Sequence, residues 1–415
     1  MTPPDPSTPH PSRHAALDRL AWFRPRMGAA YAAARNIDLG PTRREGVSGL
    51  SPYLRHRLLL ECEAVAAAAS AHGPAGAETF IQEVFWRTYW KGWLERRPGV
   101  WRAYREAVQD RAATIAAEPD LAARLRAAEA GETGLDCFDF WARELVEYGY
   151  LHNHARLWFA SLWIFTLRLP WELGADFFLR FLIDGDPASN TLGWRWVAGL
   201  QTPGKHYLAR AENIARFTEG RFRPDPADLA EEAEPLVGEP PPGAAPPPAP
   251  DRAPLRLEAG TGLLLSEEDL HPESLPGLAP RRLAAVALMS CAADRSPGAV
   301  SPSVERFTGA ALQDAGGRLE AAGAPPATRL DGDRASGRAL AEWAERAGLR
   351  TVLTPYAPVG PAAERLAAAQ AALAERGIAL RPMLREWDAR AWGHADRGFF
   401  RFRKAIPELM RAAGL

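Results

Sequence analysis

A proline-rich segment divides this 415-residue chain into two stretches of different composition. Between Arg223 and Gly260 the residues are mostly Pro, Ala, Glu and Gly, with runs of three prolines beginning at Pro240 and Pro246. Such a segment cannot bury enough apolar surface to offset its ordering entropy, so it predicts an extended linker. The 14 Trp are also unevenly placed, because all but three of them precede residue 200. The length of the chain likewise favours two domains.

These shifts in composition give the predicted boundaries. We expect a disordered N-terminus over residues 1–14, a helical domain over 15–222, a linker over 223–256 and an α/β domain over 257–415. The first 14 residues have no apolar core and cannot form a signal peptide. The most apolar stretch, Leu157 to Phe165, is too short to cross a bilayer. Three widely separated cysteines argue against a disulfide framework, so we expect a cytoplasmic protein without a membrane contact.

The two halves differ in the periodicity of their apolar residues. Residues 80–95 contain no proline and place Trp86, Trp90 and Trp93 on one face of a helix that ends at Pro98. Residues 138–150, 154–169 and 171–183 predict further helices. After the linker, short apolar runs at 262–265, 283–289, 351–353 and 378–384 alternate with Ala-rich helical stretches at 304–322, 335–347 and 361–376. That alternation predicts a Rossmann-like α/β domain with a parallel sheet.

Two polar clusters in the first half are candidate sites. The run from Asp184 to Asn190 could serve a metal, a sugar or a heteroaromatic ring, but Asp186 before Pro187 also suits an ordinary helix N-cap, which composition alone favours. Glu83, four residues before Arg87, could be only an ion pair on a helix face. The segment from Val47 to Ser51 could hold a phosphate or be an ordinary helix cap. The net charge of −1 shows no global basic excess, so any contact with DNA would need a local patch.

Four motifs taken in order are more specific than any one of them. They are GVSGLSPYL from Gly46, QEVFWR from Gln82, HNHAR from His152 and LIDGDPASNTLGWRWVAG from Leu182. Together they resemble the FAD-binding helical domain of the photolyase/cryptochrome family, over about residues 22–222. The resemblance implies an all-helical FAD-binding domain, with the antenna-type α/β domain moved to the C-terminus. It leaves open which antenna chromophore, if any, binds there.

The resemblance also implies which residues hold the FAD. Tyr31 and the turn of Ser48, Gly49, Leu50 and Ser51 match the positions that hold the pyrophosphate. Arg156 and Asp184 match an ion pair near flavin N5 and O4, Asp186 matches a carboxylate at the pyrimidine edge, and Asn190 matches the residue that faces N5. The implied cofactor-binding residues are completed by Arg87 and Gly185. No metal site is implied.

A cavity for a flipped pyrimidine dimer is implied by a further set of residues. Glu83, Trp86, Asn153 and Trp196 match residues that line it in enzymes repairing cyclobutane pyrimidine dimers. Leu157 stands where those enzymes have Met. Enzymes that repair (6-4) products have His at the positions of Asn153 and Leu157, so that chemistry is disfavoured.

For electron supply, Trp194 and Trp171 match the inner two members of a tryptophan chain. The outer position falls in an Ala-rich stretch, and the candidate substitutes are Trp101, Trp141, Trp158 and Trp163, although core packing is the commoner role of a large aromatic residue. The implied function is a light-driven DNA repair lyase that splits cyclobutane pyrimidine dimers by electron transfer from excited reduced FAD, with damaged DNA as partner. The alternatives are a cryptochrome-like blue-light photoreceptor without repair activity and a non-catalytic flavoprotein. The helical domain stops near Phe222, short of further helices in photolyases, and this favours the photoreceptor.

Overall fold

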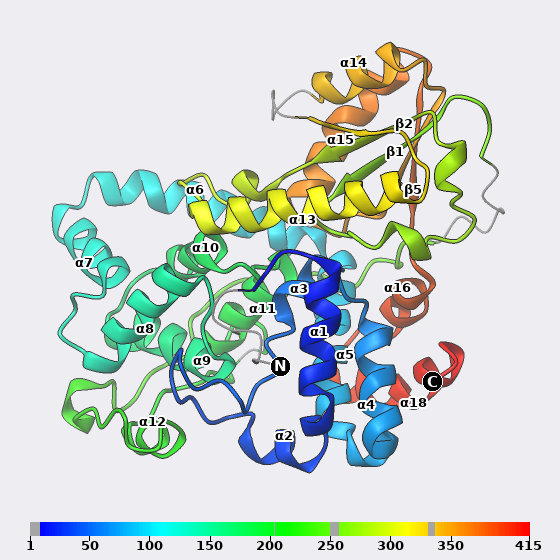
Figure 1. The fold of residues 1–415 in the computed structure, drawn as a ribbon. Coiled ribbons are helices and arrows are strands. Elements are labelled where there is room, and N and C mark those ends of the chain that lie inside the picture. Colours follow the sequence, from blue (N-terminus) through cyan, green and yellow to red (C-terminus); the bar gives the residue numbers. More distant parts are fainter. Residues whose placement is uncertain (1–8, 203, 250–256, 331–336) are drawn as a thin grey trace.

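The protein is described here by a computed structural model that covers residues 9–202, 204–249, 257–330 and 337–415 (Figure 1). Of the N-terminal segment 1–14 that we expected to be disordered, residues 1–8 lie outside the described residues, and helix α1 already begins at Arg13. Helices of residues 13–217, the helical half, gather on one side of the molecule. A parallel sheet and its helices, residues 257–383, form the sheet half on the other side. This architecture confirms the predicted fold class.

The helical half contains no strand within the part of the chain that the structure describes. Helix α9 continues into a π-helical turn, Leu162–Thr166, and α6 begins at Pro98, the residue predicted to end the preceding helix. The helices are α1 Arg13–Phe23, α2 Ala29–Ala34, α3 Ser51–Arg55, α4 Glu61–Gly76, α5 Glu78–Glu95, α6 Pro98–Ala116, α7 Pro119–Ala130, α8 Asp136–Tyr148, α9 Asn153–Ser161, α10 Trp171–Phe181, α11 Pro187–Val197 and α12 Ala211–Phe217.

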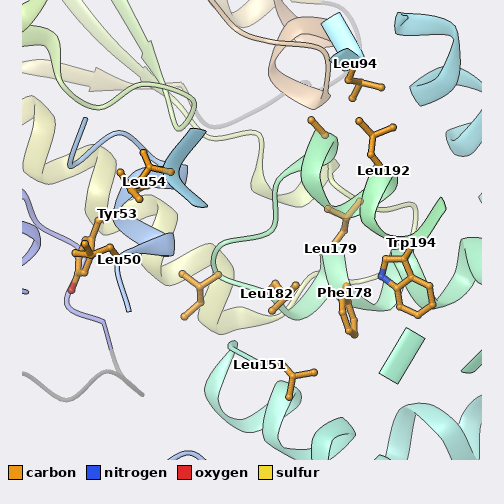
Figure 2. Close-up of a cluster of buried hydrophobic side chains, with 14 of the residues drawn as sticks. Leu50, Tyr53, Leu54, Leu94, Leu151, Phe178, Leu179, Leu182, Leu192 and Trp194 are labelled. Atoms are coloured by element: carbon orange, nitrogen blue, oxygen red, sulfur yellow. The ribbon is translucent and has the colours of Figure 1, made fainter. Parts of the chain in front are cut away.

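The core of the helical half forms where α10 and α11 pack against each other and against their neighbours. Phe178, Leu179, Leu192 and Trp194 are buried at this contact (Figure 2). Burial of these side chains removes apolar surface of both helices from water, which stabilises the contact. The same packing fixes the loop between α10 and α11, which carries the sequence from Asp184 to Asp186.

The sheet half has five parallel strands in the order β3-β2-β1-β4-β5. All six residues of β1 are buried, as expected for a strand covered on both faces. Figure 1 shows α13 crossing the junction with the helical half, whereas α14 and α15 cover the other face. The strands are β1 Thr261–Ser266, β2 Ala285–Met289, β3 Ala327–Arg329, β4 Thr351–Pro355 and β5 Ala379–Met383, and the helices are α13 Pro302–Ala321, α14 Arg338–Arg346 and α15 Pro361–Ala374. The four apolar runs predicted as strands are confirmed.

The segment between the halves lies against the helical half. Residues 229–249 contain no helix or strand. The amide of Leu236 donates to the carbonyl of Ala198 at 2.9 Å, and the amide of Ala245 donates to the carbonyl of Arg96 at 2.8 Å. The backbone polar groups of this proline-rich segment are thus partly satisfied by the helices that it crosses.

The last residues of the chain return to the helical half. Helices α16 Glu386–Ala391, α17 Phe399–Phe402 and α18 Ile406–Ala412 lie on the side of α5 rather than on the sheet (Figure 1). The ring of Trp387 stacks on Phe85 of α5 at 4.9 Å, and its indole N–H donates to Thr88. Trp392 packs over Gly92, where a Cβ atom would lie 2.5 Å from the Trp392 ring. Residues from the C-terminal end of the chain therefore cover part of α5.

No helix among the described residues is long and apolar enough to span a membrane.

We expect Gly92→Ala to destabilise the protein by about 1–3 kcal/mol, because the new methyl group must displace the buried Trp392. Thermal unfolding followed by Trp fluorescence measures the effect. The matched control is Gly317→Ala in α13, where nothing lies within 4 Å of an added Cβ. This control should be neutral or stabilising by up to about 1 kcal/mol. Equal unfolding temperatures for the two variants would contradict the described packing of residues 386–412.

Candidate functional site

The loop between α10 and α11 holds two predicted site residues in fixed positions. Arg156, from α9, donates through Nη2 to both carboxylate oxygens of Asp184, at 3.0 and 2.8 Å. The Nε atom of Arg156 donates to the carbonyl of Leu151 at 2.9 Å, which fixes the guanidinium plane. Gly185 separates Asp184 from Asp186. A larger residue would not fit there, because a Cβ atom would lie 2.9 Å from the carbonyl oxygen of Leu182. The sequence therefore brings together Arg156 and Asp184 as predicted.

Asp186 is an N-cap and also a buried anion. Its Oδ1 atom accepts from the amides of Ala188 and Ser189 at 3.0 Å, so the capping interpretation is correct. Its Oδ2 atom is buried and has no hydrogen-bond partner among the described residues. Burial opposes ionisation of this carboxyl group, but the cations Arg87, Lys91 and Arg55 outweigh it and hold the pKa of Asp186 well below its usual range. The group is consequently ionised at neutral pH.

Asn190 lies in the first turn of α11 and is 9% exposed. Its Nδ2 atom donates to the carbonyl of Ala175 at 2.8 Å. With the amide oriented in this way, Oδ1 remains as an acceptor. The helix cap at Asp186 and the bond to α10 together fix this side chain.

The turn from Ser48 to Ser51 is supported by a residue that the sequence analysis missed. Arg19 of α1 is 2% exposed and donates through Nε to the carbonyl of Ser48 at 2.5 Å. Gly49 has a φ of 62°, which favours glycine. Ser48 Oγ accepts from the amide of Leu50, and α3 begins at Ser51. Tyr31, on α2, lies edge-on to Phe80 at 5.2 Å between ring centroids.

The predicted substrate residues come from three helices. On α5, Glu83 forms an ion pair with Arg35 at 2.5 Å, and both side chains are about a quarter exposed. Burial raises the pKa of Glu83, although Arg35 opposes this shift. One turn later, Trp86 stacks on Phe399 with ring centroids 3.6 Å apart. Sequence analysis missed both of these partners.

The remaining substrate candidates lie nearer to solvent. Trp196 of α11 is 38% exposed and stacks on Tyr207 at 5.9 Å. Asn153 is exposed at the start of α9, and Leu157 is half-buried one turn further along the same helix. Residues four apart on a helix lie on the same side, so these two side chains share a face of α9.

The tryptophan residues considered for electron supply lie in three aromatic groups. Trp194 is buried and contacts the ring of Trp163 at 6.2 Å, edge to face. Trp171 contacts Tyr104 at 5.8 Å, and Tyr104 contacts Trp101 at 5.4 Å. Trp141 and Trp158 stack on each other at 5.4 Å. Of the candidate substitutes, Trp163 therefore adjoins Trp194, and Trp101 is joined to Trp171 through a tyrosine.

Comparison with known families identifies the helical half. A family model described as the FAD binding domain of DNA photolyase matches residues 80–224. Residues 80–224 are thus similar to the FAD-binding domain of the photolyase family. The matched range includes Arg156, Asp184, Asp186 and Asn190, and its cofactor is FAD.

Similar proteins extend the comparison. The chain is 36% identical to the deoxyribodipyrimidine photo-lyase of Streptomyces griseus over 159 residues, which are 38% of this chain and 33% of that protein. It is 34% identical to a protein of the same name from Thermus thermophilus over 200 residues, 48% of this chain and 46% of that protein. A crystal structure of a bacterial class III photolyase from Agrobacterium tumefaciens matches with 26% identity and a TM-score of 0.41, covering 50% of this chain and 43% of that one. The chain thus spans less than half the length of these relatives.

The photolyase-type site fits a flavin by the chemistry of its donors. Asp186 Oδ2 and Arg87 Nε are both buried and accept or donate no hydrogen bond among the residues described, although each lies in an ion pair: Asp186 Oδ2 is 3.3 Å from Arg87 Nη2, and Arg87 Nε is 3.6 Å from Glu61 Oε1. A carboxylate, an oriented amide and an Arg–Asp pair suit the N–H and carbonyl groups at the edge of an isoalloxazine ring. A buried polar atom that makes no hydrogen bond is costly in a folded protein, so a polar ligand that hydrogen-bonds Asp186 Oδ2 would stabilise it further.

Asp184→Ala should release most of the FAD, because Arg156 would be left without its carboxylate partner, at a cost of about 3 kcal/mol. The ratio of flavin to protein absorbance in the purified protein measures the loss. Asp176→Ala is the matched control, since Asp176 forms a buried pair with Arg180 at 3.0 Å on α10. A fully loaded Asp184→Ala protein would overturn the flavin assignment of this loop.

Proposed function

We propose that this protein is a light-driven lyase that splits cyclobutane pyrimidine dimers in damaged DNA. The observation that carries the proposal is on α5, where Glu83 and Trp86 lie one turn apart and both remain partly accessible. A carboxyl group beside an aromatic ring can hold the polar edge and the apolar face of a flipped base at the same time. The names of the curated relatives support the same activity.

The side chains then have separate tasks. Reduced FAD, when bound, supplies the electron after it absorbs blue or near-UV light. Asn190 and the Arg156–Asp184 pair orient the ring, while Trp86 and Trp196 pack against the bases of the dimer. Glu83, whose pKa is raised by burial, hydrogen-bonds the pyrimidine edge, and Arg35 holds its carboxyl group in place. A fixed hydrogen bond at the carbonyl where charge develops lowers the barrier to ring opening.

One contact favours the second candidate, a blue-light photoreceptor without repair activity. Phe399 of α17 covers one face of the Trp86 ring, at a centroid distance of 3.6 Å and an interplanar angle of 12°. A base could use only the uncovered side of this indole. A photoreceptor has no need of a dimer cavity, so the repair assay separates the two functions.

Two further assignments accompany the proposal. We place the protein in the cytoplasm, where its DNA substrate lies. We also assign the sheet half to the antenna-type α/β domain of the family, in reversed order along the chain. Its strand order, with β1 between β2 and β4, supports this assignment because ligands of such sheets bind where the order reverses.

Glu83→Ala should reduce repair under blue light about ten- to a hundredfold while FAD content is retained, because one hydrogen bond of about 1–3 kcal/mol is lost at the dimer. The assay uses the purified protein with reduced FAD, an oligonucleotide that contains one thymine dimer, and a dark control. Glu78→Ala, in the exposed first turn of the same helix, serves as the matched variant and should repair normally. If the wild-type protein repairs no dimer, the photoreceptor function replaces this proposal.

Trp194→Phe should slow photoreduction of oxidised FAD by at least about tenfold, since a phenyl ring is a much poorer one-electron donor than an indole. Absorbance at flavin wavelengths under illumination with an external reductant follows the reaction. Trp93→Phe, on α5, is the control and should behave as wild type. Unchanged photoreduction in Trp194→Phe would show that electrons reach the flavin by another route.

A further inference from the structure

The turn that carries Asp184 and Asp186 is held from behind by a buried arginine. Arg55, at the end of α3, donates through Nε to the carbonyl of Gly185 at 2.9 Å. Its Nη2 atom donates to Glu268 Oε1 at 2.6 Å, and its side chain is only 1% exposed. Glu268 follows β1 by two residues, so a carboxylate of the sheet half fixes the cation that fixes the turn.

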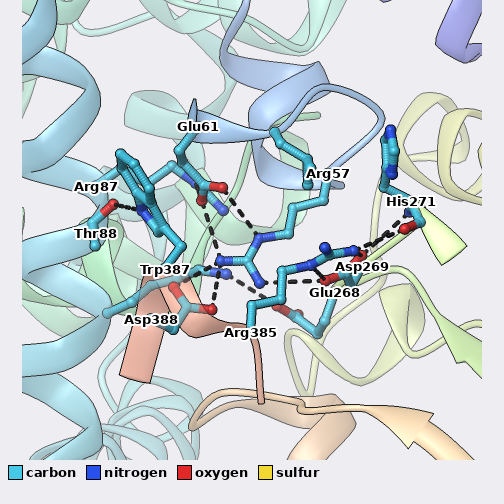
Figure 3. Close-up of polar contacts among 12 residues, drawn as sticks. Arg57, Glu61, Arg87, Thr88, Glu268, Asp269, His271, Arg385, Trp387 and Asp388 are labelled. Atoms are coloured by element: carbon cyan, nitrogen blue, oxygen red, sulfur yellow. Dashed lines mark hydrogen bonds and ion pairs between the residues drawn. The ribbon is translucent and has the colours of Figure 1, made fainter. Parts of the chain in front are cut away.

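Lys91 gives Glu268 a second connection to the same turn. The Nζ atom of Lys91 lies 3.5 Å from Glu268 Oε2 and 3.7 Å from Asp186 Oδ2. Burial opposes ionisation of Glu268, but Arg55 and Lys91 outweigh it and lower the pKa of this carboxyl group. Glu268 is therefore a buried anion whose two oxygens each engage a cation that approaches Asp186. Figure 3 shows Glu268 within the wider network of charges at this junction.

A neighbouring strand supplies another support to the loop. Arg295, six residues after β2, donates through Nη1 to the carbonyl of Leu182 at 3.2 Å and is 1% exposed. The strands β1 and β2 are parallel neighbours, so their carboxyl ends meet at one edge of the sheet. This edge therefore reaches both ends of the turn, at Leu182 and at Gly185.

We propose that Glu268 is a positioning residue of the flavin site and that the sheet half is a working part of that site. The proposal rests on the assignment of FAD to the turn, and it does not require repair activity. Glu268 acts through Arg55 and Lys91: it holds Arg55 against the carbonyl of Gly185 and shares Lys91 with Asp186. The carboxylate of Asp186 and the backbone beside it then keep one orientation toward the ring.

If Glu268 loses its charge, we expect its two cationic partners, Arg55 and Lys91, to change their contacts. Arg55 Nε already lies 3.9 Å from Asp186 Oδ2, and Asp186 would be the nearest remaining anion. The guanidinium would close on Asp186 and leave the Gly185 carbonyl, because an unpaired buried cation moves toward the nearest available charge. Asp186 would turn toward Arg55, and the flavin edge would lose its partner.

The test compares Glu268→Gln with Asp388→Asn in the full-length chain. Asp388 is also buried, and it accepts from Arg57 at 2.7 and 2.8 Å within the same network but without a described contact to the turn. Both variants should lower the unfolding temperature. Only Glu268→Gln should weaken FAD binding, by about tenfold or more, as measured by titrating the apoprotein and following flavin fluorescence. It should also shift the midpoint potential of the bound flavin and speed amide exchange at residues 183–186 in the apoprotein.

The proposal is overturned if Glu268→Gln keeps the wild-type FAD affinity, flavin midpoint potential and amide exchange at residues 183–186. An equal loss of FAD in Asp388→Asn would also overturn it. If Glu268→Gln does not fold, Glu268→Asp is tested instead. This variant keeps the charge, but its side chain is shorter by one methylene group. Faster exchange at residues 183–186 is then expected in Glu268→Asp, and unchanged exchange overturns the proposal. A wild-type protein that binds no FAD would instead refute the flavin assignment, whereas absence of repair in an FAD-loaded protein would leave this inference intact.

Discussion

The structure depends on a set of buried charges that neither half of the chain can neutralise alone. Arg55, Arg57 and Lys91 belong to the helical half and are at most 3% exposed. Their partners include Glu268 and Asp269 of the sheet half and Asp388 of the C-terminal helix α16, which come more than 170 residues later in the chain. Because an unpaired buried ion is strongly destabilising, the two halves must meet in one register for either set of charges to be satisfied. The junction is thereby specified by charge as well as by shape.

Helix α5 joins this constraint to the candidate site. Its residues Glu83 and Trp86 remain partly accessible, whereas Lys91 and Gly92 are buried toward the sheet half and the C-terminal helices. A single rigid helix thus connects the proposed substrate contact with the charged junction. Since Lys91 also approaches Asp186, the orientation of α5 and that of the flavin loop are set by the same ions.

The position of the chain's C-terminus bears on both candidate functions. Phe399 stacks on Trp86, and Tyr89 donates to the carbonyl of Arg397 at 2.9 Å. The helical half ends with α12, and the chain spans less than half the length of the relatives that it matches. Residues 386–412 therefore provide part of the wall beside α5, and they come from a different place in the sequence than the rest of that wall.

Local patterns in the sequence determined much of the fold and indicated most of the residues that we assign to the flavin site. Apolar runs located four of the five strands, while β3 was missed because its residues are largely exposed and form no such run. The motifs also indicated Arg156, Asp184, Asp186 and Asn190, which recur within short segments. Only the tertiary structure decided which ions support them: Arg55 and Glu268 are 213 residues apart, and such a pair leaves no spacing signature. The periodicity of apolar residues indicates which face of its own helix or strand a residue lies on. Its partners across the junction between the halves depend on how the elements pack.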